Sequence, residues 1–130
     1  MTGPPMRLSE IHKLLRCDVY AGESLLESVQ IDCGCASDLM SDVLAFSRSG
    51  AILLTGLANL QTVQTAFIAE VNAIVVVRGK RPDAGVRAMA EERKIPLLGS
   101  PFSMYEACGL LYRTGLPSTM ICEAGAERHG

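Results

Sequence analysis

The densest group of cations in this sequence is Arg78, Lys80 and Arg81, arranged around Gly79. Cationic side chains and exposed backbone N–H groups bind phosphate groups in proteins, so we expect N–H groups after Gly79 to add donors. The candidate ligand-binding residues are Ser37, Asp38, Thr55, Gly56, Asn59, Arg78, Gly79, Lys80, Arg81 and Ser100. In an alternative interpretation, the cations only solvate a loop and pair with Asp83.

Catalytic arrangements are weakly represented in the sequence. A Walker A loop, in which a second glycine is followed by lysine and then serine or threonine, is absent. Nucleophilic catalysis by serine or cysteine needs a positioned base, but His12 falls in an amphipathic segment and His129 lies next to the C-terminal residue. We therefore predict no catalytic residues and no enzymatic activity.

Two groups of residues have metal-ligand chemistry. Asp38 and Asp42 would share one face of a helix, close in sequence to Asp32, and carboxylates are magnesium ligands. Cys33 and Cys35 form a close thiol pair, but no second pair or nearby histidine completes a zinc site. We interpret the aspartates as caps and solvated side chains and the cysteines as small buried ones, and we predict no metal and no cofactor.

Charge and hydropathy argue against nucleic-acid and membrane partners. The 12 Lys and Arg residues against 14 Asp and Glu give a net charge of −2, which supplies no attraction for nucleic acid. The sequence holds no apolar run of about 18 residues, the length that spans a bilayer, and no signal peptide, so we predict a cytoplasmic protein. Its five scattered cysteines favour reduced thiols.

Short apolar runs alternate with helical segments along most of the chain, which is typical of βα units on a parallel sheet. The runs are 29–32, 51–54, 73–77 and 95–98, and 17–21 is a candidate edge strand. We predict a single three-layer α/β/α domain with a mostly parallel central sheet. Loops that follow parallel strands meet at one edge of the sheet, which would bring the candidate ligand residues together.

Capping residues predict where the helices begin. Asn59 is a candidate N-cap, and Ser103 with Glu106 forms a capping box. Pro82 suits the first turn of a helix, and Asp83 beside it favours the positive end of the helix dipole. The helix after Asn59 is expected to bury Leu60, Val63, Phe67 and Val71, and a helix within 37–47 is expected to bury Leu39, Val43, Leu44 and Phe46.

The helix after Ser103 carries two apolar stripes. One can meet the sheet, and the second consists of Tyr105, Gly109 and Tyr112. Hydrophobic residues make up 48% of the chain and charged residues only 20%, so part of this apolar surplus is available for an interface. We predict that the second stripe forms a homodimer interface.

Five segments follow one another as in a known family. They are ASDLMSDVL (36–44), LTG (54–56), RGKRPD (78–83), IPLL (95–98) and SPFSMYEA (100–107). With these segments the chain resembles the DRTGG domain family over most of its length. The resemblance implies an α/β/α domain that is related in fold to the N-terminal domain of HPr kinase, is regulatory or dimer-forming, and is also found between the CBS domains of regulatory pyrophosphatases.

These observations define the expected organisation and function. We expect a flexible N-terminus at 1–7, a DRTGG-like domain at 8–118, and a partly disordered C-terminal tail at 119–130. The expected function is a non-catalytic regulatory module that homodimerises and senses a phosphate-bearing metabolite, such as an adenine nucleotide, at the strand-end loops. The alternatives are a protein-interaction subunit that docks on a larger enzyme and a small phosphate-handling enzyme.

Overall fold

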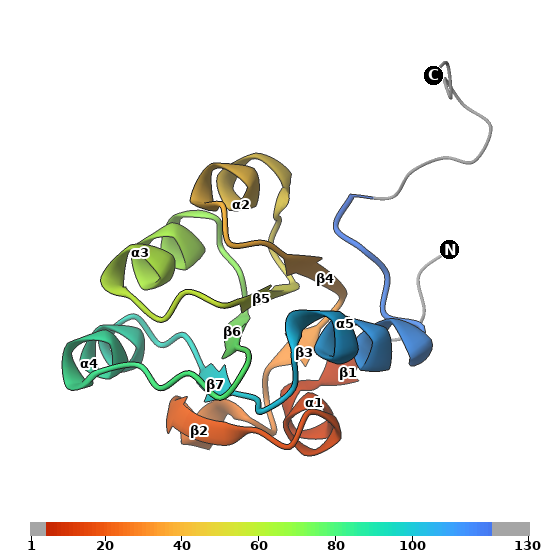
Figure 1. Ribbon diagram of the computed structural model, residues 1–130, viewed down its shortest axis with the longest axis horizontal. Coiled ribbons are helices and arrows are strands. Elements are labelled where there is room, and N and C mark those ends of the chain that lie inside the picture. Colours follow the sequence, from red (N-terminus) through yellow and green to blue (C-terminus); the bar gives the residue numbers. More distant parts are fainter. Residues whose placement is uncertain (1–4, 121–130) are drawn as a thin grey trace.

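A five-stranded sheet forms the centre of the fold (Figure 1). The computed structural model describes residues 5–120. The strand order across the sheet is β2 (Asp18–Ala21), β7 (Leu97–Gly99), β6 (Ala73–Val76), β5 (Ala51–Thr55) and β4 (Cys33–Ala36). Strands β4 to β7 are parallel, and β2 pairs antiparallel with β7 at one edge. The predicted mostly parallel sheet and the edge strand near residue 18 are therefore confirmed.

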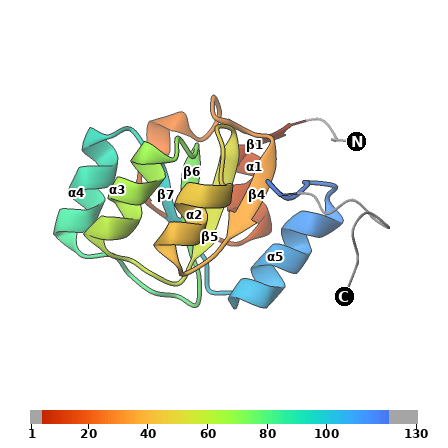
Figure 2. The same cartoon turned by 90° about the horizontal axis from the view of Figure 1, so that it is seen from above.

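Helices cover both faces of the sheet, as Figures 1 and 2 show. On one face lie α2 (Met40–Phe46), α3 (Leu60–Ile68) and α4 (Ala84–Glu92), and on the other lie α1 (Leu8–Leu14) and α5 (Met104–Arg113). A short 3-10 helix, Glu23–Leu25, follows β2. The strands β5 and β6 are buried at every residue, as central strands between two helical layers must be. This is the predicted three-layer α/β/α arrangement.

The first parallel strand lies later in the chain than the sequence predicts. A strand forms within the expected run 29–32, but its expected place in the parallel sheet is wrong, because Gln30–Ile31 (β3) pairs antiparallel with Met6–Arg7 (β1) in a separate two-stranded sheet. The parallel edge strand is β4, whose glycine and alanine have low strand propensity. The segment is a strand because its backbone pairs with β5. Met6 and Arg7, which the sequence assigns to a flexible terminus, thus belong to a strand.

Two helices expose apolar side chains that the sequence predicts as buried. In α2 only Met40 and Val43 face the core, and in α3 the buried residues are Thr62, Val63, Thr65 and Ala66. The expectation of burial is wrong for Leu39, Leu44, Phe46, Leu60 and Phe67, whose side chains are about half exposed. The buried residues of α3 have small or medium-sized side chains, and its larger Leu60 and Phe67 face outward. The ring of Phe67 instead lies beneath the guanidinium of Arg93.

The predicted cap residues Asn59 and Ser103 are confirmed, and Asp83, expected only to favour the helix dipole, is the N-cap of α4. The side chains of Asn59, Asp83 and Ser103 accept hydrogen bonds from the backbone N–H groups of Thr62, Val86 and Glu106, at 2.9, 3.0 and 3.2 Å. Each cap satisfies one backbone donor that a helix leaves free in its first turn, and so fixes where the helix starts.

Within residues 5–120, none of the helices has the length and apolar character needed to cross a membrane.

Candidate functional site

Strands β4 to β7 end at the same edge of the sheet, and each is followed by a helix that begins there. Figure 2 shows the connections that lead into α3, α4 and α5 along one side of the molecule. We call Asp38, Thr55, Gly56, Arg78 and Lys80 the strand-end site, because these five predicted residues interact at this edge.

The carboxylate of Asp38 is the centre of the strand-end site. Its Oδ1 atom accepts a hydrogen bond from the backbone N–H of Gly56 at 2.6 Å and another from the Thr55 hydroxyl at 3.0 Å. Thr55 Oγ1 also accepts the N–H of Leu57 at 3.2 Å. Thr55 and Gly56 are buried, whereas Asp38 is exposed. The end of β5 therefore offers two converging donors to an anion at the surface, and in this structure the anion is Asp38.

The guanidinium of Arg78 lies against Gly56. A Cβ atom at residue 56 would stand 2.5 Å from Nη2 of Arg78 and 3.1 Å from its Cζ, so glycine is what admits the cation here. Arg78 is exposed and has a φ of 64°, in the left-handed region that side chains other than glycine rarely adopt. The fold thus holds Arg78 in an uncommon backbone conformation beside the end of β5.

The backbone of the 78–80 loop is already hydrogen-bonded. The N–H of Arg78 donates to the carbonyl of Phe102 at 2.7 Å, and the N–H of Gly79 donates to the carbonyl of Ser100 at 2.8 Å. The N–H of Lys80 points back to the carbonyl of Val77 at 3.5 Å. Among the N–H groups after Gly79 that were expected to serve a ligand, that of Lys80 is therefore already directed at a carbonyl group. What the loop can offer is its exposed side chains.

Ser100 also has a structural task. Its buried hydroxyl donates to the carbonyl of Leu15 at 2.7 Å and accepts the N–H of Phe102 at 3.2 Å. These bonds attach the end of α1 to the loop after β7 and leave the hydroxyl without a free hydrogen for a ligand.

Ser37, Asn59 and Arg81 complete the predicted set. The Ser37 hydroxyl exchanges hydrogen bonds with the backbone of Leu39, and Asn59 caps α3. Arg81 is exposed, next to Pro82. Among residues 5–120, Arg7 and Glu27 form the one ion pair closer than 4.0 Å. The alternative interpretation, in which the loop cations pair with Asp83, is therefore not what the structure shows. The side chains of Arg78, Lys80 and Arg81 remain open to solvent.

The charge state of Asp38 follows from these contacts. The hydrogen bond from the Gly56 N–H is the main cause that lowers the pKa of Asp38, with smaller contributions from the Thr55 hydroxyl and the charges of Arg78 and Lys80. Hydrogen bonds and cations both favour the ionised form of a carboxyl group. Asp38 is therefore a carboxylate at neutral pH.

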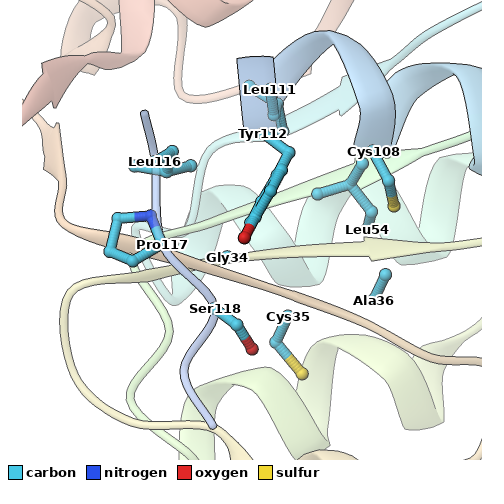
Figure 3. A pocket seen from close by; sticks show the side chains of 10 residues that line it. All are labelled: Gly34, Cys35, Ala36, Leu54, Cys108, Leu111, Tyr112, Leu116, Pro117 and Ser118. Carbon is cyan, nitrogen blue, oxygen red and sulfur yellow. The ribbon is translucent and has the colours of Figure 1, made fainter. Parts of the chain in front are cut away.

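A second feature, which the sequence did not indicate, is a groove between β4, α5 and residues 116–118 (Figure 3). It has a volume of about 200 Å³. The residues that line this β4 groove are Gly34, Cys35, Ala36, Leu54, Cys108, Leu111, Tyr112, Leu116, Pro117 and Ser118. The carbonyl of Pro117 accepts the N–H of Gly34 at 2.8 Å, and Thr119 donates to the carbonyl of Gly34 at 3.0 Å, so the chain runs along the edge strand.

Three of the thiols, those of Cys17, Cys35 and Cys108, have environments that favour the protonated form. Burial raises the pKa of Cys35 and of Cys108, which both line the β4 groove, and burial followed by the charge of Asp18 raises the pKa of Cys17 to about 12. A thiol that stays protonated is a poor nucleophile and a poor metal ligand. Among the described residues, no three histidine, cysteine or acidic side chains come together in a metal-binding group.

The outer face of α5 carries the predicted interface residues. Tyr105 is 91% exposed and Tyr112 is 73% exposed, and a Cβ atom at Gly109 would meet no other atom within 4 Å. On the side of the helix that faces the sheet, Ala107 and Leu111 are buried, and Met104 and Cys108 of the other expected stripe are half-buried. The structure thus presents two aromatic rings to solvent, with a bare stretch of helix between them.

Comparison with known proteins supports the fold. No protein-family model and no curated protein sequence matches the chain. Its structure is similar to that of the CBS and DRTGG domains of the regulatory region of Clostridium perfringens pyrophosphatase, complexed with the activator diadenosine tetraphosphate. The TM-score is 0.69 at 14% sequence identity, over 91% of this chain and 51% of that chain. The two share a fold. The chain spans about half the length of that regulatory region.

Proposed function

We propose that this protein is a non-catalytic regulatory module of the DRTGG type, which binds a phosphate-bearing metabolite at the strand-end site. The observation that supports this most is the way the site holds Asp38. A buried backbone N–H and a buried hydroxyl already converge on one carboxylate oxygen, and the Arg78 guanidinium lies nearby, against Gly56. The same donors suit a phosphate oxygen, which accepts charge-assisted hydrogen bonds in the same way.

An adenine nucleotide is the proposed class of ligand. The similar pyrophosphatase region is complexed with diadenosine tetraphosphate, which combines adenine with a chain of phosphates. Arg78, Lys80 and Arg81 are exposed at the strand-end edge, and three cations suit a polyphosphate better than a single carboxylate. We therefore expect affinity to increase from adenosine monophosphate to the triphosphate.

A thermal-unfolding screen tests the proposal. A ligand that binds only the folded chain stabilises it by about 2.7 kcal/mol at a concentration of about 100 times its Kd. We expect an adenine nucleotide to raise the unfolding temperature, and the double variant Arg78→Ala, Arg81→Ala to abolish the rise. The control is Lys94→Ala with Arg113→Ala, which removes the same charge from residues that precede β7 and end α5. If the rise in unfolding temperature survives in the Arg78, Arg81 double variant and disappears in the Lys94, Arg113 control, the ligand binds elsewhere.

The exposed face of α5 favours a second property, self-association. We propose that Tyr105, Gly109 and Tyr112 form the contact between two copies of the chain, since exposed aromatic rings beside a bare helix surface suit close packing of helices. Light scattering is expected to show a dimer that Tyr105→Ser with Tyr112→Ser converts to a monomer. A wild-type monomer at high micromolar concentration excludes this interface and favours docking on another protein.

A further inference from the structure

The donors of the strand-end site are occupied before any ligand arrives. We propose that the carboxylate of Asp38 is a built-in competitor of the phosphate ligand: it binds the donors of Thr55 and Gly56 in the free protein, and a phosphate group displaces it. This inference rests on the proposed function of the site and adds the residue that sets its affinity.

The hydrogen bonds show what Asp38 blocks. One oxygen, Oδ1, takes both the Gly56 N–H at 2.6 Å and the Thr55 hydroxyl at 3.0 Å. The second oxygen, Oδ2, receives no hydrogen bond from any residue that the structure describes. Asp38 therefore occupies both inner donors of the site through one oxygen atom, Oδ1. The other half of its carboxylate faces outward. A larger anion could accept hydrogen bonds from the same two donors.

The surrounding turn stays in place when the Asp38 side chain leaves. Ser37 and Leu39 are joined by their own hydrogen bonds, in which the Ser37 hydroxyl accepts the Leu39 N–H at 3.0 Å. Thr55 keeps its bond from the Leu57 N–H. Since Asp38 is exposed and lies before the first residue of α2, rotation of its side chain breaks two hydrogen bonds and no packing of the core.

The charges favour the exchange. The Arg78 guanidinium lies against Gly56, and Lys80 acts on Asp38 through its charge. A single carboxylate neutralises one of these cations, whereas a di- or triphosphate brings more negative charge and more acceptor atoms. The carboxylate also repels an incoming phosphate, so its charge lowers the affinity that the cations would otherwise give.

Calorimetric titration of the wild type and three variants with inorganic pyrophosphate and with adenosine diphosphate tests this. Asp38→Asn keeps the size of the side chain and one acceptor oxygen but removes the charge. Asp42→Asn, four residues later and also exposed, is the matched control for net charge. We expect Asp38→Asn to bind both probes about tenfold more tightly than the wild type, and Asp42→Asn to bind as the wild type does. Asp38→Ala, which removes the acceptor as well, is expected to gain at least as much.

The outcomes separate the two proposals. If both Asp38 variants bind the probes no more tightly than the wild type, while wild-type binding depends on Arg78, the competitor role of Asp38 is overturned. The proposal that the ligand binds at the strand-end site then still stands. Absence of binding in every chain overturns both. Carbon-13 NMR of the wild type provides a second readout, because displacement takes the Gly56 hydrogen bond from Asp38 and raises the pKa of its carboxyl group. An Asp38 pKa that does not move at saturating pyrophosphate contradicts displacement.

Discussion

Replacing Gly56 with alanine is expected to weaken ligand binding at the strand-end site while leaving the stability of the fold almost unchanged. The new Cβ atom would stand 2.5 Å from Nη2 of Arg78 and 3.2 Å from its Nη1, well inside van der Waals contact. Arg78 is exposed, so its guanidinium can swing into solvent, and the backbone of Gly56 does not need the left-handed conformation that favours glycine. The substitution therefore moves the cation and little else.

The size of the effect follows from the role of the guanidinium. A hydrogen bond to a charged group contributes about 1.5–3 kcal/mol, so displacing Arg78 is expected to raise the Kd for pyrophosphate by about 10- to 100-fold. A flexible side chain that moves into water costs the fold little, so the free energy of unfolding should change by less than about 1 kcal/mol.

Calorimetry gives the Kd and urea denaturation gives the stability. Gly85→Ala is the control, because its Cβ would meet only Asp83 Oδ1 at 3.5 Å, an ordinary contact in α4. That change should stabilise the helix by about 0.5–1 kcal/mol and leave the Kd unchanged. Binding of pyrophosphate by Gly56→Ala as tightly as by the wild type would contradict the proposed role of Arg78. A loss of more than about 2 kcal/mol in the free energy of unfolding would contradict the expected small effect on stability.

Three further expectations concern stability and thiol chemistry. Ser100→Ala removes the donor to the Leu15 carbonyl and should cost about 1–3 kcal/mol in urea denaturation; a loss near zero would contradict the structural role of the hydroxyl. Cys17, with a pKa of about 12, should resist iodoacetamide at about pH 8 in the folded chain and react once unfolded, as mass spectrometry can show. Asp38 has a lowered pKa, so its contribution to stability is fully present above its ordinary value of 3.8 and is lost as pH falls through the lowered value. The difference in unfolding free energy between wild type and Asp38→Asn should therefore change as pH falls from above 3.8 into strong acid, with the wild type losing stability relative to the variant. A difference that does not change with pH over this range excludes the linkage.

Local signals in the sequence predicted the parts of the fold that depend on neighbouring residues. Asn59, Asp83 and Ser103 mark three helix starts correctly, because each cap bonds a residue only three positions away. The run at 73–77 is recognisable as a central strand because both of its faces are apolar. These features need no knowledge of distant parts of the chain.

Features decided by distant contacts were predicted less well. Gln30–Ile31 is apolar enough for the main sheet, but Met6–Arg7 is its partner, and that pairing leaves β4 as the edge strand. The faces of α2 and α3 were misjudged because both are apolar on more than one side. Only their packing against each other and the sheet shows that Leu44 and Phe67 face outward.

The candidate site shows the same division. The strand-end rule brought Asp38, Thr55, Gly56 and Arg78 together, since parallel strands end at one edge. The sequence could not show that the N–H of Gly79 is taken by Ser100, because this bond joins two loops about 20 residues apart. Nor could it show that Asp38 occupies the donors, which depends on the direction of a single side chain.

Amide NMR spectra recorded during a titration with adenosine diphosphate test most directly whether the ligand binds at the strand-end site. We expect the amide signals of Thr55, Gly56 and Arg78 to shift together, with one saturation curve that fits a single Kd. Shifts centred on Cys35, Cys108 and Tyr112, which line the β4 groove, would contradict this expectation, as would the absence of any saturable shift.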